Sequence, residues 1–571
     1  MRQNGHKRLP ILQAAWLLAL AGLFVISNPG VLQRISIVVE EGKTAALLGL
    51  LGVWLMSLFA VLCVVTSSSL AVRAFWGILL GASTASGLIF LRTSGGELSV
   101  FDILSIWYAR YGAGDAIAFH QFDFALGIAV AVLLALAAIL SPFRGRLLPQ
   151  WKVLWCFPVV PILAIVAIIH AREGQGSRGL PQQFAPLGMI ALVAPILVSD
   201  QKQERQAVAW EPGPGLARKI VLLVDESVRS DHIDLQSSSR TSPELAALRD
   251  KVVNFGPAAS GSNCSAYSNA ILRFGAKQDD LTHSVRTNAP IWKFAKAAGY
   301  KTAFIDAQAV LVKKYGSKFN NFMTAWEAQD IDYYVELDGT QPAHDLDHQL
   351  IEKVLELMRL PEPVFIYANK VGAHFPYEDR YPPSAREFQP TLQDERSPQA
   401  RTNSYRNAIR WSVDRVVARL LRDTPSDDAV VIYTSDHGQN LSEGRLTHCS
   451  VEGPDPSEAV VPLLVSTNRP ALKTSFDAST NGTAGHFSHF DIAPTLMKLM
   501  GYRAEDVLSY YGSSLLSPMV RKPIQFSSGD IFGLFSATVR WTDIDLPERS
   551  RQPDNARPQP ATEARASETD P

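Results

Sequence analysis

The apolar residues of this chain are concentrated in its N-terminal third, and this asymmetry limits what the chain can fold into. Within residues 1–171 five apolar stretches are long enough, or nearly so, to cross roughly 30 Å of hydrocarbon as helices. At 571 residues the chain is also too long for one ordinary core. We therefore expect a five-span transmembrane domain over 1–171, followed by a separate globular domain. The expected spans are 11–27, 45–65, 74–91, 122–140 and 153–170.

Basic residues set the expected orientation of these spans. They precede the first span and lie between spans two and three and between spans four and five. Because Lys and Arg mark cytoplasmic segments, everything after residue 171 should lie on the opposite side, which in a bacterium is the periplasm. The first span resembles a signal peptide, because basic residues precede its apolar run. Four further spans nevertheless favour an uncleaved anchor in the inner membrane. The basic residues are Arg2, Lys7, Arg8, Arg73, Arg144, Arg146 and Lys152.

The loop 92–121 should lie on the same side as the C-terminal domain. Its aromatic and apolar residues suit an interfacial helix that touches lipid or the catalytic domain, with plain loop packing as the alternative. These residues are Phe101, Ile103, Trp107, Tyr108 and Tyr111.

Residues 172–218 are rich in Gly, Pro, Gln and charge and are expected to form a connector. Its apolar patch at 186–198 is short for a span and contains two prolines, so an interfacial or buried helix is favoured. The alternative, a sixth span, would place the C-terminal domain in the cytoplasm.

From residue 219 onward, short β-branched runs alternate with amphipathic stretches. This alternation predicts an α/β domain over 219–540 with a mainly parallel sheet and helices on both faces. The last residues, 541–571, lack apolar periodicity and are expected to be a disordered tail. Strands are predicted in KIVLLVDE, KTAFID, PVFIYANK, AVVIYTSDHG and AVVPLLVST, and helices near 291–298, 349–359, 403–421 and 492–500.

The net charge is −1, and no dense Lys/Arg patch occurs. Binding to nucleic acid is therefore not supported. The informative residues are instead carboxylates, hydroxyls and imidazoles that follow apolar strand runs, where sites form in open α/β sheets. These are Asp225, Glu226, Ser265, His374, Asp436, His437 and His448.

Oxygen and imidazole ligands around one hydroxyl suit a metal-activated nucleophile. Ser265 is our choice for that hydroxyl, because SAYSNAILRF should begin a helix whose N–H groups and dipole can bind a phosphoryl group. Ser262 is the second choice, and Asn263 and Ser268 could cap the helix or orient phosphate. This setting suits phosphoryl transfer through a covalent phospho-serine, and the membrane domain suggests a lipid substrate.

Five motifs follow one another along the chain in the order VDESVR, SGSNCSAYSN, GAHFPYEDRYP, YTSDHGQNLSEG and HFDIAPTLMKLMGY. With these motifs the chain resembles the phosphoethanolamine transferases of the alkaline phosphatase and sulfatase-like superfamily, over both the membrane anchor and the catalytic domain. The resemblance implies one or two Zn²⁺ ions, with Mn²⁺ as the less favoured metal. It implies Glu226, Ser265, Asp436 and His437 as ligands and Ser265 as nucleophile. His374 and His448 would bind the transferred phosphate or a second zinc.

Two features depart from the family pattern. The family nucleophile is usually Thr, but Ser265 supports the same chemistry. Most of the cysteines of the lipid A-modifying members are missing, so the acceptor stays open among lipid A, a core sugar and a periplasmic glucan. Cys264 and Cys449 each adjoin a proposed site residue, and in an oxidising compartment we expect them to form a disulfide, with a free thiol or a metal ligand as alternatives. Cys63 and Cys156 should pack within spans.

Other polar residues have plainer interpretations. Asp225 should support Glu226 rather than bind metal, and His486 and His489 should belong to a structural turn before the final helix. His374 and His448 could be ordinary loop histidines. Tyr405, Asn407 and Asp414 should serve packing and surface charge.

The leading functional hypothesis is transfer of phosphoethanolamine from phosphatidylethanolamine to an envelope glycolipid or glycan, with release of diacylglycerol. Transfer of phosphoglycerol is an alternative at the same site. A sulfatase is disfavoured because Cys264 is followed by Ser-Ala-Tyr-Ser, not by the sulfatase motif, whereas a metal-dependent phosphodiesterase stays open. A noncatalytic scaffold would have no use for the set of ligand-type residues.

Overall fold

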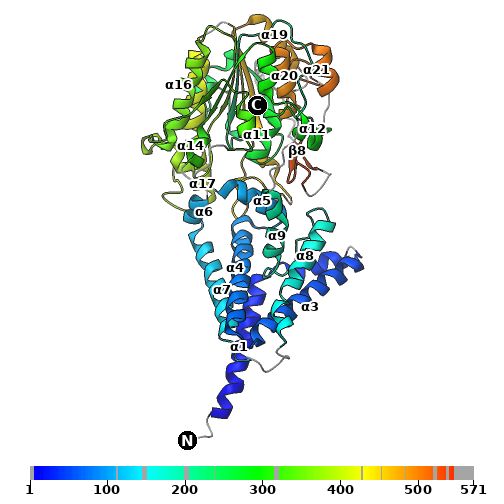
Figure 1. Cartoon of the computed structure of the whole chain (residues 1–571). Coiled ribbons are helices and arrows are strands. Elements are labelled where there is room, and N and C mark those ends of the chain that lie inside the picture. Colours follow the sequence, from blue (N-terminus) through cyan, green and yellow to red (C-terminus); the bar gives the residue numbers. More distant parts are fainter. Residues whose placement is uncertain are drawn as a thin grey trace, which may run out of the picture.

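The apolar N-terminal residues fold into helices that occupy one end of the molecule, and an α/β domain occupies the other (Figure 1). The computed structural model describes residues 5–545 apart from 41, 111–112, 144–150, 199–204, 237, 314–319, 426–427, 452, 482–483, 519–523 and 535–538. The N-terminal helices are α1 (Gly5–Ser27), α2 (Val31–Glu40), α3 (Thr44–Thr66), α4 (Leu70–Ser94), α5 (Val100–Ala109), α6 (Ala113–Phe119), α7 (Gln121–Ile139), α8 (Val159–Ala171) and α9 (Ala185–Val198).

Five full spans are not confirmed. Among the described residues α3, α4 and α7 are long and apolar enough to cross a membrane, and α1 with α2 forms a fourth candidate that is bent by 59°. The predicted fifth span is shorter than expected, since α8 has only 13 residues. Pro158 explains this limit, because it stands at the N-cap of α8 and a proline cannot continue a helix in the N-terminal direction without disturbing it. A 3-10 turn at Lys152–Cys156 precedes it.

The connector patch forms α9, with 14 residues and a proline inside it. Ala185, Met189 and Val193 are spaced four residues apart and are all buried, so they form one apolar stripe. They share a core with residues of α5 and α8. Among the described residues α9 is a short apolar helix packed against other helices, and it is not one of those long enough to cross a membrane.

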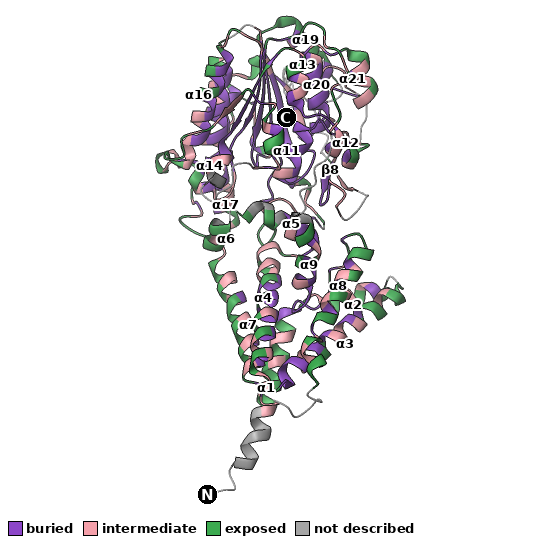
Figure 2. Cartoon of the chain, in the orientation of Figure 1, coloured by how far each residue is buried: buried purple, intermediate pink, exposed green. Residues whose placement is uncertain are grey.

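The outward faces of the long helices remain apolar and exposed, as Figure 2 shows for α3 and α7. Leu55 is 68% exposed and Phe122 is 68% exposed. Exposed apolar surface on this scale is not stable in water and is the face that a helix presents to lipid.

The C-terminal domain has a seven-stranded sheet in the order β2-β7-β6-β1-β5-β3-β4. The five strands β6, β1, β5, β3 and β4 are parallel, whereas β7 is antiparallel to both β6 and β2. The mainly parallel sheet is thus confirmed. The strands are β1 (Lys219–Asp225), β2 (Val252–Ala259), β3 (Lys301–Asp306), β4 (Tyr333–Val335), β5 (Val364–Asn369), β6 (Ala429–Ser435) and β7 (Val460–Thr467).

Helices cover both faces of this sheet. Along β1, Val221 and Leu223 face one core, and Ile220, Leu222 and Val224 face the other. A strand that is buried on both faces reads as a continuous apolar run, which is why β1 shows no alternation in the sequence. The helices are α10 (Pro243–Ala246), α11 (Ser265–Arg273), α12 (Leu281–Thr287), α13 (Ile291–Ala297), α14 (Ala307–Lys313), α15 (Ala325–Ala328), α16 (Leu346–Met358), α17 (Pro398–Ala408), α18 (Arg415–Asp423), α19 (Pro470–Thr480), α20 (Ile492–Leu499) and α21 (Ala504–Tyr511).

A small second sheet pairs β8 (Gln525–Ser528) with β9 (Arg540–Asp543). Paired strands therefore extend past the predicted domain boundary at residue 540. Of the expected disordered tail, residues 546–571 lie outside the described part of the chain.

The segment 92–121 contacts the catalytic domain, which is one of the two contacts expected of a helix in this loop. Helix α5 begins with a capping box in which Ser99 accepts a hydrogen bond from Asp102 N–H and Asp102 accepts one from Ser99 N–H. Phe101 is 3% exposed and shares an apolar cluster with Val451, and the guanidinium of Arg540 lies 5.1 Å from its ring centroid. The helix thus joins the membrane bundle to the α/β domain.

Phe101→Ala should loosen this junction. Removing a buried phenylalanine costs about 3–5 kcal/mol, and the loss falls on the contact between α5 and the β8–β9 pair. Hydrogen–deuterium exchange in both segments should rise. Ile106→Ala is the matched control, because Ile106 lies on the same helix and is 48% exposed. Equal exchange in the two variants would contradict the assignment of Phe101 as the junction residue.

Candidate active site

Two neighbouring parallel strands bring the acidic residues together. β1 pairs with β6 in a register that places Asp225 opposite Ser435, so both strands end at the same level. The chain then turns in both places, and Asp436 N–H donates a hydrogen bond of 2.8 Å to Asp225 O. Glu226, Asp436 and His437 therefore meet at this edge, each at most 1% exposed.

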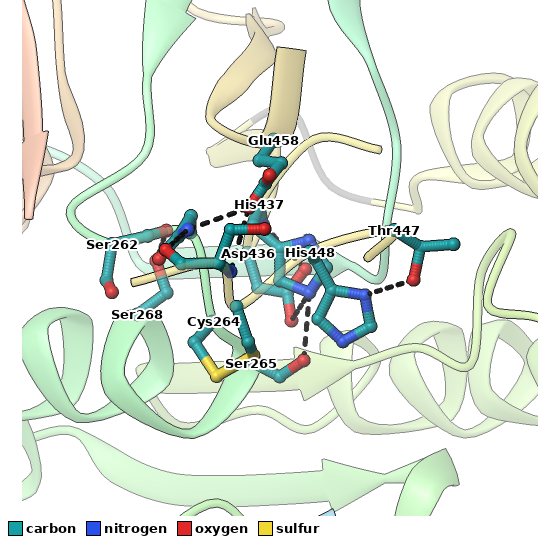
Figure 3. Close-up of a disulfide and its surroundings, with 12 residues drawn as sticks. Ser262, Cys264, Ser265, Ser268, Asp436, His437, Thr447, His448 and Glu458 are labelled. Atoms are coloured by element: carbon teal, nitrogen blue, oxygen red, sulfur yellow. Dashed lines mark hydrogen bonds and ion pairs between the residues drawn. A yellow bond between two sulfur atoms is a disulfide. The ribbon is translucent and has the colours of Figure 1, made fainter. Parts of the chain in front are cut away.

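Ser265 lies beside this group as the first residue of α11. Its Oγ is 3.0 Å from His437 Nε2 and donates to Glu226 Oε1 at 3.2 Å. Ser265 is half-buried, whereas Ser262 is fully buried. A nucleophile must be reachable by substrate, so this difference favours Ser265 over Ser262 (Figure 3).

His448 lies beside His437, and His374 lies beside His448; both residues are half-buried. The ring of His448 stacks on that of His437, with centroids 4.3 Å apart and planes inclined by 20°, and it lies 6.0 Å from the ring of His374. His374 Nδ1 contacts the carbonyl of Phe375, so this nitrogen carries the hydrogen in the neutral ring and Nε2 is left as an acceptor. Burial lowers the pKa of both histidines, and His437 adds to the effect at His448.

Glu226, Asp436 and His437 shift one another's pKa values. Burial and the charge of Glu226 raise the pKa of Asp436 well above its usual range. Burial would also raise the pKa of Glu226, but the neighbouring imidazole of His437 outweighs it and holds that pKa well below its usual range. Burial opposes a charged His437, yet the carboxylates of Asp436 and Glu226 prevail and raise its pKa to about 9. The two buried carboxylates thus favour a positive charge next to them, here on His437.

The donor set fits a metal ion. Glu226, Asp436 and His437 each offer one ligand atom, and these atoms lie within 4.8 Å of one another. Asp436 Oδ2 is buried and has no hydrogen-bond partner among the described residues, as expected of an oxygen that is left open for a cation. Carboxylates with an imidazole suit Zn²⁺, and Ser265 Oγ lies within 3.2 Å of Glu226 and His437 in this group. His448 is outside this three-residue group.

Asp225 has a different environment from Glu226. Its carboxylate pairs with the buried ammonium of Lys370 at 2.5 Å and accepts a hydrogen bond of 3.0 Å from Tyr433 Oη. It is not part of the metal-ligand group. This geometry agrees with a supporting role for Asp225.

Gln308 was not singled out from the sequence, although it contacts Glu226 directly. Its Nε2 donates to Glu226 Oε2 at 2.9 Å and to Lys370 O at 2.8 Å, and its Oε1 accepts hydrogen bonds of 3.1 Å from Asn320 and Asn321. The signal was present, because Gln308 follows the end of strand β3 at the edge where sites form. It was missed because an amide is neither a strong ligand nor a nucleophile.

The remaining polar residues have structural contacts. His489 lies between Ser268 Oγ and Thr434 Oγ1, both at 3.3 Å, and so joins α11 to β6, while burial lowers its pKa to about 3. Tyr405 Oη donates to Ser227 O at 2.7 Å. Asp414 accepts hydrogen bonds from the backbone N–H groups of Glu244 and Leu245. The predicted disulfide between Cys264 and Cys449 is present.

Gln308→Ala should weaken metal binding by about 10–100-fold, the usual cost of removing a partner that orients a ligand. Glu226 Oε2 would lose the amide that fixes its rotation, while its position on the chain is unchanged. Zinc affinity measured by competition with a chelator tests this. Gln341→Ala is the control, since Gln341 is exposed. Wild-type affinity in Gln308→Ala would show that the amide does not orient Glu226.

Comparisons with known proteins agree on one family. Residues 218–502 match the sulfatase family model. The chain is 29% identical over 241 residues to "Phosphoethanolamine transferase EptC" of Escherichia coli strain RS218, which covers 39% of this chain and 40% of that protein. It is 24% identical over 433 residues to "Phosphatidylethanolamine transferase Mcr-2" of Escherichia coli, which covers 68% of this chain and 76% of that protein.

The fold extends the similarity to the membrane part. The integral membrane lipooligosaccharide phosphoethanolamine transferase A of Neisseria meningitidis matches 86% of this chain and 96% of its own, with a TM-score of 0.58 and 16% identity. The match includes the helical N-terminal region as well as the α/β domain. By sequence, residues 218–502 thus form a sulfatase-family domain whose curated relatives are named as phosphoethanolamine transferases, and the likeness to the solved membrane protein extends the shared fold to the helical region.

Proposed function

We propose that this protein transfers phosphoethanolamine from phosphatidylethanolamine to a cell-envelope glycolipid or glycan through a phospho-serine at Ser265. The observation that carries the proposal is a half-buried hydroxyl at a helix N-terminus, within 3.2 Å of two residues of a buried metal-ligand group. Relatives named as transferases of the same group support the choice of donor. Lipid A, a core sugar and a periplasmic glucan are the candidate acceptors.

Zn²⁺ is the cofactor that this donor set fits best. Glu226, Asp436 and His437 would hold it, and Ser265 Oγ would be the fourth ligand. When bound, the ion would lower the pKa of the Ser265 hydroxyl and offset negative charge on the phosphoryl oxygens. The ion, rather than a protonated His437, would then compensate the negative charges of the buried Glu226 and Asp436.

The protein's own groups would then position the donor. Ser265 Oγ would bond to phosphorus as the bond between phosphorus and the diacylglycerol oxygen breaks, and the proton of the Ser265 hydroxyl would pass to that oxygen, which leaves as diacylglycerol. Ser265 is the first residue of α11, and N–H groups at a helix N-terminus can bind phosphoryl oxygens. His448 and His374 lie next to each other beside His437 and would contact phosphoryl oxygens. An acceptor hydroxyl then attacks the phosphorus of phospho-Ser265, which regenerates the serine.

The site would face the periplasm from a multi-pass inner-membrane protein. Basic residues flank the opposite ends of the expected spans, and a disulfide beside Ser265 suits an oxidising compartment. The diacylglycerol that leaves would remain in the bilayer next to the helical bundle.

Incubation of the purified full-length protein with zinc and phosphatidylethanolamine, without acceptor, should give a phosphoethanolamine adduct on Ser265 that intact-mass and peptide mass spectrometry detect. A transferase keeps this adduct until an acceptor arrives, whereas a hydrolase would let water discharge it. Release of free phosphoethanolamine without an adduct would therefore favour a hydrolase. An adduct with phosphatidylglycerol only would change the donor to phosphoglycerol, and an adduct on Ser262 would change the nucleophile.

Two substitutions should separate the nucleophile from the metal site. Ser265→Ala should abolish transfer while keeping part of the bound zinc, because three ligands remain. Asp436→Asn should lose both the bound zinc and the transfer activity, since Asp436 would supply a buried ligand oxygen. Zinc content by elemental mass spectrometry, with transfer measured on the same samples, tests this pair. Full activity of Ser265→Ala would end the proposal of covalent catalysis at this residue.

A further inference from the structure

The segment that carries His448 lacks regular structure of its own. Between the end of β6 at Ser435 and the 3-10 turn Pro456–Glu458, the described residues form only turns, bends and coil. The metal-ligand group is different, because Glu226, Asp436 and His437 follow directly from paired strands. Something other than strand pairing must therefore fix His448 over Ser265.

A disulfide provides the first part of that restraint. Cys264 immediately precedes Ser265, Cys449 immediately follows His448, and the two cysteines are 185 residues apart in the chain. The bond therefore joins the backbone of the nucleophile to the backbone of the histidine, with Cα atoms 4.6 Å apart. Figure 3 shows the disulfide on one side of the Ser265 hydroxyl and the ring of His448 on the other. Cys449 N–H also donates to Asn263 O at 2.8 Å.

A buried polar clamp provides the second part. Asn263 Nδ2 donates to Ser450 O and to Glu458 Oε2, both at 2.8 Å, and Ser450 N–H donates to the same Glu458 oxygen at 3.0 Å. Asn263 and Glu458 are each 1% exposed. Asn263, next to Cys264, and Ser450, next to Cys449, are thus also linked by hydrogen bonds.

The backbone at Cys449 explains why such restraint is needed. Its φ of 61° lies in the left-handed region, which is unfavourable for a residue with a Cβ atom and persists where the surroundings impose it. This turn directs the preceding His448 back over the site, where its ring stacks on His437. A loop that is freed from Asn263 and Cys264 would relax toward ordinary φ values and move His448.

We propose that the Cys264–Cys449 disulfide is a positioning element for catalysis, which sets His448 over Ser265 and makes transfer depend on an oxidised chain while metal binding does not. The proposal rests on the transferase function proposed above. The rival explanation is that the bond only stabilises the fold. The two differ in what happens to a folded, metal-loaded protein without the bond.

The test compares the wild type with the double variant Cys264→Ser/Cys449→Ser, in full-length protein with zinc and phosphatidylethanolamine. Zinc content should equal that of the wild type, KM should stay within about twofold, and kcat should fall by about 10–100-fold, the scale expected when a catalytic group is displaced by about 1 Å. Cys63→Ser/Cys156→Ser is the matched control, because these two cysteines are not disulfide-bonded. It should keep wild-type kcat. An unchanged kcat in the double serine variant would overturn the proposal.

A double-mutant cycle with His448→Ala separates positioning from stability. If the bond acts through His448, removal of both should cost no more than His448→Ala alone, because the two losses share one cause. A bond that only stabilises the fold would give independent, multiplicative losses and a lower melting temperature, which would overturn the positioning role. Should the double serine variant fail to fold, mild reduction of the folded wild type and of Cys63→Ser/Cys156→Ser replaces it.

Hydrogen–deuterium exchange supplies a measurement that is independent of the donor. Without the bond, exchange in residues 440–451 should rise while β1 and β6 keep their protection. If the wild type formed no adduct on Ser265, the proposed function would fail, yet the exchange result would still decide whether the bond fixes this loop. No change in exchange would mean that the clamp alone holds His448, and the proposal would be wrong.

Discussion

The parallel pairing of β1 with β6 is the interaction on which the site depends. Because neighbouring parallel strands end at one edge, Glu226 and Asp436 meet there and both carboxylates are removed from water. Burial of two such charges is unfavourable unless positive charge or hydrogen bonds compensate them. His437 supplies that compensation in the protein itself, and a cation would supply it better. The sheet therefore builds a buried acidic group that could hold a metal ion.

A second charged cluster lies one residue away from the first and holds the His374 loop. Lys370, at the end of β5, is fully buried between Asp225 and Asp347, and Asp347 accepts the N–H groups of Val371 and Gly372. At Gly372, with φ of 56°, a Cβ atom would lie 2.2 Å from Asp225 Oδ1. Only glycine permits this approach, so the turn that leads to His374 is fitted to the same carboxylate.

The sequence predicted the parts of the molecule that local pattern determines. All five predicted strands occur, and the ends of β1 and β6 located Glu226, Asp436 and His437 before any geometry was known. β2 and β4 were not predicted, because β2 contains Asn, Gly and Pro and β4 has only three residues. The fifth expected span is not confirmed, because Pro158 stands at the N-cap of α8 and leaves that helix with 13 residues. Gln308 and the Asn263–Glu458 clamp depend on contacts between distant segments, which no local pattern records.

Contacts with the membrane bundle suggest why the two histidine loops face it. The ring of Phe119 in α6 lies 4.6 Å from that of Phe375, next to His374, and Val451 near His448 shares a cluster with Phe101 of α5. Gly95, at the end of α4, approaches the backbone of Gly444 so closely that a Cβ atom would lie 2.2 Å from its carbonyl oxygen. The loops that carry His374 and His448 thus contact helices of the N-terminal region. A lipid whose phosphate stays near the bilayer would approach the site from the side on which these two loops lie.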